Sequence, residues 1–211
     1  MGHQMPNEAD SLFDECLPPH MQTAVSVAMT RAYVATEHII DSHPLLYGDL
    51  HSDIRPHIRR IAVDICLKEL ATAESGFRAV LQFNKAKNCR HVELHAKRLL
   101  ITASYVESKK QLPRKAAFRQ ARSACHNMSL FAAEPINSLP LHPYAHLLHG
   151  SIGKKIDFLL FTIPDITGKF SILSRALEIS PPEQAAPIEE IKDEVLKFLT
   201  IQQNDKLTGS I

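Results

Sequence analysis

The residues whose types and spacing most clearly suggest a binding function lie in the segment 109–122. It contains no acid and the six basic residues Lys109, Lys110, Arg114, Lys115, Arg119 and Arg122. Positive charge at this density can neutralise several phosphates at once, which favours binding to nucleic acid or another phosphate-bearing ligand. Phe118 is the only aromatic residue in the segment, so contacts to a phosphate backbone are favoured over base stacking. The alternative is a basic surface that is merely solvated.

Charge is distributed unevenly along the chain, although the formal net charge is only +1. Residues 1–54 carry eight acids and one base, and residues 178–205 carry seven acids and two bases. Residues 85–122, in contrast, carry eleven bases and two acids. The acidic ends could therefore fold over the basic centre, or the centre could be free for an anionic partner.

Part of the basic segment has the periodicity of a helix with two different faces. One face would carry Lys115, Arg119, Arg122 and His126. The opposite face would carry Ala117, Ala121, Ala124, Cys125 and Met128. Because apolar helix faces pack against sheets, we expect the alanine face and Cys125 to be buried and the basic face to point to solvent.

Four residues, one of them the Lys109 already named, suggest hydrolytic chemistry. Glu93 lies in an expected strand, Glu107 and Lys109 follow the next strand, and Gln120 lies in the helix after it. This order of helix, three strands, helix and strand resembles the core of the PD-(D/E)xK nucleases, where an acid on the second strand and an E-x-K on the third bind Mg²⁺ and activate water. The resemblance implies Glu93, Glu107, Lys109 and Gln120 as catalytic residues with Mg²⁺ as cofactor. A relative of that fold without catalysis remains an alternative, as does a simple polar turn at Glu107.

Histidines form a second candidate cluster in the sequence LHPYAHLLHG. If Pro143 opens a short helix, His146 and His149 share one face and His142 lies near its start, so three imidazoles could bind Zn²⁺. The alternative is that these histidines bond backbone carbonyls. His91 and His95 flank Glu93 on one face of a strand, which favours a polar cross-strand face.

The hydrophobic pattern predicts an α+β fold: a mostly antiparallel sheet of about five strands with helices packed on it, in the order α-α-β-β-β-α-β-β-α. Helices are expected at 21–40 and 53–74, and strands at 77–83, 89–95, 99–106, 156–163 and 169–179. The strand 99–106 is apolar on both faces and is expected at the centre of the sheet. Prolines and glycines predict a long loop over 132–155, with a turn or two of helix near 144–149.

This pattern divides the chain into an arm, a domain and a tail. Residues 1–19 are expected to form a loosely attached arm, 20–180 a single α+β domain, 181–187 a linker, and 188–211 a C-terminal helix and polar tail. The four cysteines have no CxxC spacing, which favours buried thiols. No apolar run approaches the roughly 20 residues of a membrane span, and the polar start lacks the features of a secretory signal, so we expect a cytoplasmic protein without membrane contact.

Three functions remain open from the sequence. The leading hypothesis is a non-catalytic accessory or regulatory protein that binds nucleic acid, or another phosphate-bearing ligand, through the basic helix. The second is a Mg²⁺-dependent nuclease of degenerate PD-(D/E)xK type. The third is an interaction module whose acidic ends and basic centre contact another protein or a second copy of the chain.

Overall fold

The computed structural model of the protein describes residues 8–43, 51–84, 87, 89–127, 143–182, 191–195 and 197. Its helices are α1 (Glu8–Cys16), α2 (Pro19–Ser42), α3 (His51–Ala73) and α4 (Ala117–His126). Its strands are β1 (Phe77–Phe83), β2 (Arg90–Ala96), β3 (Leu99–Tyr105), β4 (Tyr144–Ile152), β5 (Lys155–Pro164) and β6 (Ser171–Leu177). Residues 191–195 are also helical, at the start of the predicted C-terminal helix.

One six-stranded sheet organises the fold, with the strands in chain order from β1 to β6. Every neighbouring pair is antiparallel except β3 and β4, which are parallel and separated in sequence by α4. This confirms an α+β fold with a mostly antiparallel sheet, and it places β3 next to the centre as predicted. The number of strands was predicted as about five and is six.

The additional strand is β4, which lies within the predicted loop 132–155. Residues 144–149 are not a turn of helix but a strand that is buried on both faces. Pro143 precedes the strand and Gly153 follows it, so these residues bound the strand without interrupting it. Gly150, at its end, is required by packing because an added Cβ would lie 2.2 Å from the Phe158 ring.

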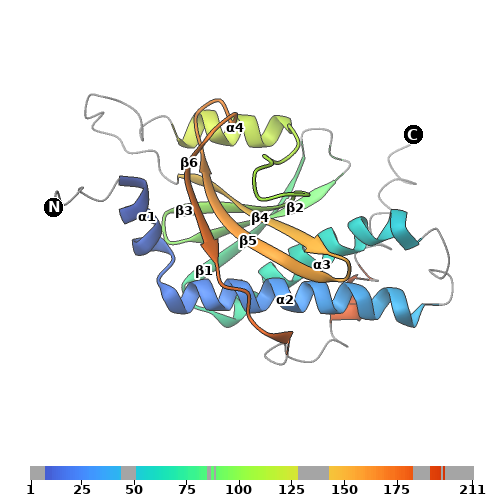
Figure 1. Ribbon diagram of the computed structural model, residues 1–211. Helices are drawn as coiled ribbons and strands as arrows, with labels where there is room; N and C mark the ends of the chain where they lie inside the picture. The colour runs from blue at the N-terminus through green and yellow to red at the C-terminus, as the bar shows by residue number, and fades with distance from the viewer. Residues whose placement is uncertain are drawn as a thin grey trace.

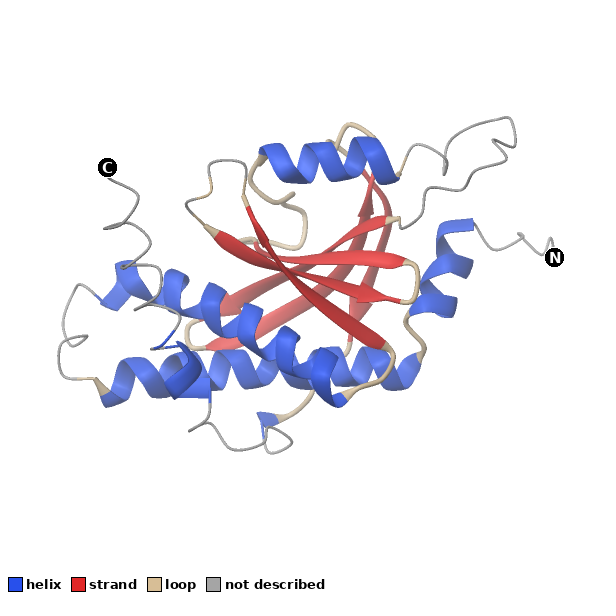
Figure 2. Ribbon diagram, turned by 180° about the vertical axis from the view of Figure 1, so that it is seen from behind, coloured by secondary structure: helices blue, strands red, loops and turns tan. Residues whose placement is uncertain are grey.

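The helices cover the two faces of the sheet unequally. α2 and α3 lie side by side across one face, and α4 lies alone over the other (Figure 1, Figure 2). The main hydrophobic core forms between the sheet and the helix pair, where Met29, Ile61 and Leu147 are almost completely buried. α2 is rich in alanine, which allows a close approach, and Pro19 occupies its first turn where no backbone donor is lost. None of the described helices is long and apolar enough to cross a membrane.

The segment predicted as a loose arm is attached to the core. α1 buries Leu12, Phe13 and Cys16, and the Phe13 ring lies 4.8 Å from the ring of Phe161 on β5. Asp10 and Asp14 also form ion pairs with Arg175 on β6. An apolar stripe at i, i+1 and i+4 explains this packing, so α1 belongs to the folded domain. The other predicted domain boundaries fall largely outside the described residues.

The sheet opens at one end between β2 and β3. Their paired residues run only from Leu94 and Ile101 to Ala96 and Leu99, whereas β1 and β2 pair along their whole length. In the open part, the backbone N–H of Val92 donates to the carboxylate of Asp64 on α3 at 3.1 Å. Burial raises the pKa of Asp64 to about 6, against the opposing influence of Arg60. A helix side chain therefore replaces a strand partner here, and the end of β3 loses its neighbour on that side.

Candidate functional site

The basic segment divides into a loop half and a helix half. In the loop half, which precedes α4, Lys109, Lys110, Arg114 and Lys115 are exposed. None of these four side chains forms an ion pair with a carboxylate among the residues that the structure describes. Lys115 was predicted on the helix but lies before its first residue. We call these four residues the basic loop.

In the helix half, the cations point toward the sheet. Arg122 donates two hydrogen bonds to the carboxylate of Glu93, each 3.0 Å long. Arg119 is partly buried and donates to the backbone oxygen of Arg114 at 2.8 Å. Burial lowers the pKa of Arg119, as expected for a cation withdrawn from water. Both arginines are therefore already bonded to groups of the protein, although about a third of the Arg122 side chain remains exposed.

The predicted orientation of α4 is consequently wrong. The residues expected in the core, Ala117, Ala121, Ala124 and Cys125, are exposed. The physical reason lies in the facing strand, where Glu93 is only 3% exposed and needs a cationic partner. Four small side chains would gain little from burial, so the carboxylate determines which face of the helix turns inward.

Glu93 is the centre of a polar layer beneath α4. His91, on the same strand face as predicted, places a ring nitrogen 3.7 Å from the Glu93 carboxylate. Burial alone would raise the pKa of Glu93, but the His91 ring and the Arg122 guanidinium lower it below its ordinary value. Phe118 stacks on His91 with ring centroids 4.2 Å apart, so this aromatic residue serves helix packing.

The same layer continues onto β4 and fixes the end of α4. The Tyr144 hydroxyl lies 2.7 Å from the Thr102 hydroxyl and 3.3 Å from Nδ1 of His146. Asn127 donates to the backbone oxygens of Tyr144 and Pro164 and accepts from the Tyr144 N–H. Asn127 therefore bonds the end of α4 to β4 and β5, and no sequence pattern indicated this role.

The histidines do not form the predicted cluster. Because β4 is a strand, His146 and His149 are an odd number of residues apart and point to opposite faces. His146 lies beneath α4, whereas Nδ1 of His149 faces the Tyr33 hydroxyl of α2 at 2.8 Å. Burial lowers the pKa of each to about 3, so both are neutral at physiological pH. His142 lies outside the described residues, and no group of three metal-ligating side chains occurs in the described part of the chain.

The structure does not bring the predicted catalytic residues together. Glu93 is 3% exposed and bound to Arg122, in the part of β2 that no longer pairs with β3, whereas Glu107 lies beyond the end of β3. Glu107 and Lys109 are exposed beyond the end of β3, and Gln120 is exposed on α4. The element order α3-β1-β2-β3-α4-β4 is present as the resemblance implied. An acid and an E-x-K pair do not converge within it, so the site for Mg²⁺ is not assembled from these residues.

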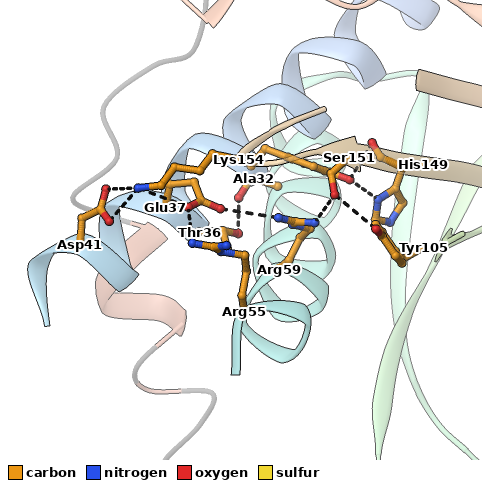
Figure 3. Close-up of polar contacts among 12 residues, drawn as sticks. Ala32, Thr36, Glu37, Asp41, Arg55, Arg59, Tyr105, His149, Ser151 and Lys154 are labelled. Atoms are coloured by element: carbon orange, nitrogen blue, oxygen red, sulfur yellow. Dashed lines mark hydrogen bonds and ion pairs between the residues drawn. The ribbon is translucent and has the colours of Figure 1, made fainter. Parts of the chain in front are cut away.

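A second charged cluster, which sequence reasoning missed, lies where the parallel strands β3 and β4 end (Figure 3). The buried Arg59 of α3 donates to the Ser151 hydroxyl at 2.8 Å and lies 3.5 Å from the Glu37 carboxylate of α2. Its guanidinium also lies 4.5 Å from the centre of the Tyr33 ring. Glu37 is the only acid among residues 21–40 of α2, and this acid was the available signal for a buried partner.

The outer part of this cluster approaches the surface. Arg55 pairs with Glu37 at 3.2 Å, and Lys154 pairs with Asp41 at 2.9 Å (Figure 3). The Tyr105 hydroxyl lies 3.3 Å from Ser151 Oγ, and 45% of Tyr105 is exposed. The basic loop begins at the same end of the sheet, because Lys109 lies 5.9 Å from the ring of Phe158, which pairs with Gly150. Tyr105 and Lys109 thus lie at the same end of the sheet but on opposite faces, because Tyr105 pairs with His149, which faces α2, and Phe158 pairs with the next residue, Gly150.

Comparisons with known proteins give no assignment: neither a family model, nor a curated protein, nor a solved structure matches this chain.

Proposed function

We propose that the protein binds nucleic acid through the basic loop, by contacts to the phosphate backbone and without chemistry. The observation that carries the proposal is that Lys109, Lys110, Arg114 and Lys115 are exposed and have no carboxylate partner among the described residues. Cations on one short loop match the spaced negative charges of a phosphate backbone. Arg119 and Arg122, which the sequence assigned to the same role, serve instead to hold α4 on the sheet.

The position of the loop supports this proposal. The backbone N–H of Val106 donates to the oxygen of His149 at 2.9 Å, so the chain leaves β3 directly beside the end of β4. Gln111 closes a turn within the loop by accepting from the N–H of Glu107 at 2.9 Å. The exposed Lys155 follows on the adjacent β4–β5 hairpin. The cations are therefore presented from the end of the two central strands of the sheet.

The test is a titration of fluorescently labelled DNA and RNA, followed by anisotropy at several salt concentrations. If all four cations contact phosphates, affinity should fall about 100-fold between 50 and 200 mM monovalent salt. The variant Lys109→Glu/Lys110→Glu should lose at least tenfold in affinity at 100 mM salt, because two contacts become repulsive.

The matched control is Arg78→Glu/Lys169→Glu, which has the same change in charge. Both residues are exposed and lie at the opposite end of the sheet, at the start of β1 and in the turn after β5. This control should lose no more than about threefold, through the change in net charge alone. Absence of binding at 50 mM salt, or equal losses in the two variants, would exclude the basic loop as the binding surface.

A further inference from the structure

Tyr105 is exposed although it belongs to a strand at the centre of the sheet. The residues of β2 that pair with β3 end at Leu94, opposite Ile101, so among the described strands the last part of β3 has a partner only on the β4 side. The sheet therefore leaves the ring uncovered toward β2, and 45% of the residue remains exposed. An exposed aromatic side chain at this position is a consequence of how the sheet opens.

Three neighbouring side chains fix the position of the Tyr105 ring. Its hydroxyl lies 3.3 Å from Ser151 Oγ, and its centroid lies 5.7 Å from the His149 ring in an edge-to-face arrangement. Arg59 contacts both Ser151 and the ring itself, since it donates to Ser151 and lies 5.8 Å from the Tyr105 ring. Arg59 is only 5% exposed. A ring fixed in this way loses little conformational freedom when a ligand stacks on it.

Other exposed side chains lie at the same end of the sheet as the Tyr105 ring. Ile152, next to Ser151, is 72% exposed, and Lys155 pairs opposite it in the hairpin. The basic loop begins four residues after Tyr105. An exposed aromatic ring, an exposed aliphatic side chain and exposed cations at one end of the sheet match the chemistry of a nucleic-acid strand, in which flat bases alternate with phosphates.

We propose that Tyr105 stacks against an unpaired base, so that the ligand of the basic loop is single-stranded nucleic acid. The inference rests on the proposed function, because the basic loop supplies the phosphate contacts. In a duplex, both faces of each internal base are already stacked and cannot reach the ring. A single strand offers free base faces, so it gains the stacking contact and the duplex does not.

The experiment compares a labelled 12-nucleotide single strand with a duplex of the same sequence, at 100 mM salt. The parent protein should bind the single strand at least tenfold more tightly than the duplex. Tyr105→Ala should weaken single-strand binding about tenfold, as loss of one stacked base does, and leave duplex binding within twofold. Tyr105→Phe retains the ring and should stay within threefold of the parent for both ligands.

The matched control is Phe170→Ala, which removes another exposed aromatic side chain, 70% exposed, in the turn between β5 and β6. It should leave both affinities unchanged. Thermal unfolding of each variant identifies loss of structure, and the Tyr105→Phe variant tests the ring even if Tyr105→Ala unfolds.

The outcomes separate this inference from the proposed function. Loss of single-strand binding in Tyr105→Ala together with retention in Tyr105→Phe supports stacking. Equal binding of single strand and duplex, unchanged by Tyr105→Ala, overturns the inference while the basic loop remains the binding surface. Absence of binding to either ligand overturns both.

Discussion

The two halves of the basic segment contain the same kinds of side chain and use them differently. In the basic loop, the cations extend into solvent from the end of β3. In α4, the cations turn inward, and Arg122 binds the carboxylate of Glu93. The difference lies in what each half faces: α4 covers a strand that carries a buried acid. A run of positive charge therefore indicates a binding surface only where the opposing elements carry no matching carboxylate.

Replacing one arginine in each half by methionine tests this division and should give the largest change in stability. Arg122→Met leaves Glu93, which is 3% exposed, without its cationic partner, and should lower the free energy of unfolding by about 3 kcal/mol at pH 7. Arg114→Met removes an exposed cation and should change it by less than about 0.5 kcal/mol. Urea denaturation followed by circular dichroism measures both.

A double-mutant cycle adds a control for this pair. Glu93→Gln alone leaves Arg122 without a carboxylate partner, but about a third of the Arg122 side chain is exposed and can reach water. Glu93→Gln should therefore lower the free energy of unfolding less than Arg122→Met does. Combined with Arg122→Met, it should recover part of the lost stability, since no buried charge remains unpaired. Similar losses in Arg114→Met and Arg122→Met would contradict the assignment of the two halves.

The next effect concerns pH and the layer beneath α4. Burial, assisted by Arg119, lowers the pKa of His146 to about 3 in the folded state, whereas in the unfolded chain it is near 6.5. The unfolded chain therefore takes up a proton as the pH falls below 6.5, and the folded protein does not. The contribution of His146 to the free energy of unfolding is therefore fully present above pH 6.5. It should fall by about 2 kcal/mol between there and pH 5.

The measurement compares the parent with His146→Gln, at pH 7.5 and pH 5.0. Asp64 acts in the opposite direction, since burial raises its pKa to about 6, and His149 acts in the same direction as His146. Both are present in parent and variant, so the difference between the two pH responses isolates His146. An identical loss of stability in both proteins would show that His146 can be protonated where it lies.

Sequence patterns were informative wherever a single physical signal dominated. β1, β2 and β3 were predicted within one residue at their ends, because their alternating or continuous apolar pattern has no competing interpretation. β4 was missed because two histidines interrupt its apolar run and its flanking prolines and glycines indicated a loop. The central position of β3 followed from its two apolar faces.

The candidate site was less predictable because it depends on contacts between distant segments. Periodicity correctly grouped Arg119 and Arg122 on one face of α4, but it could not show that Glu93, 29 residues before Arg122, would attract that face. Arg59 and Ser151 are 92 residues apart, and their contact exists only because β3 and β4 end beside α3. Tyr105 is exposed because β2 departs from β3, which no local pattern encodes.

Chemical modification of a cysteine on α4 should change the stability of the protein less than the substitutions above. Cys125 is exposed, whereas Cys16 and Cys66 are buried and burial raises the pKa of both thiols. A thiol reagent should label Cys125 in the folded protein, and the labelled protein should retain its melting temperature within about 2 °C. Cys125→Ser should abolish the fastest labelling and leave only slower labelling of the half-buried Cys89. Rapid labelling of Cys66 in the native state would contradict the packing of α3.

The smallest expected effect is at Ala121, on the exposed face of α4. Ala121→Glu should change the free energy of unfolding by less than about 0.5 kcal/mol, since glutamate is a good helix former and the site faces solvent. A loss above about 2 kcal/mol would show that the alanine face is buried, as the periodicity predicted. The same variant also tests whether α4 takes part in nucleic-acid binding. Because Ala121 lies outside the basic loop, its new charge should weaken nucleic-acid binding far less than Lys109→Glu/Lys110→Glu does, and an equal loss would extend the binding surface onto α4.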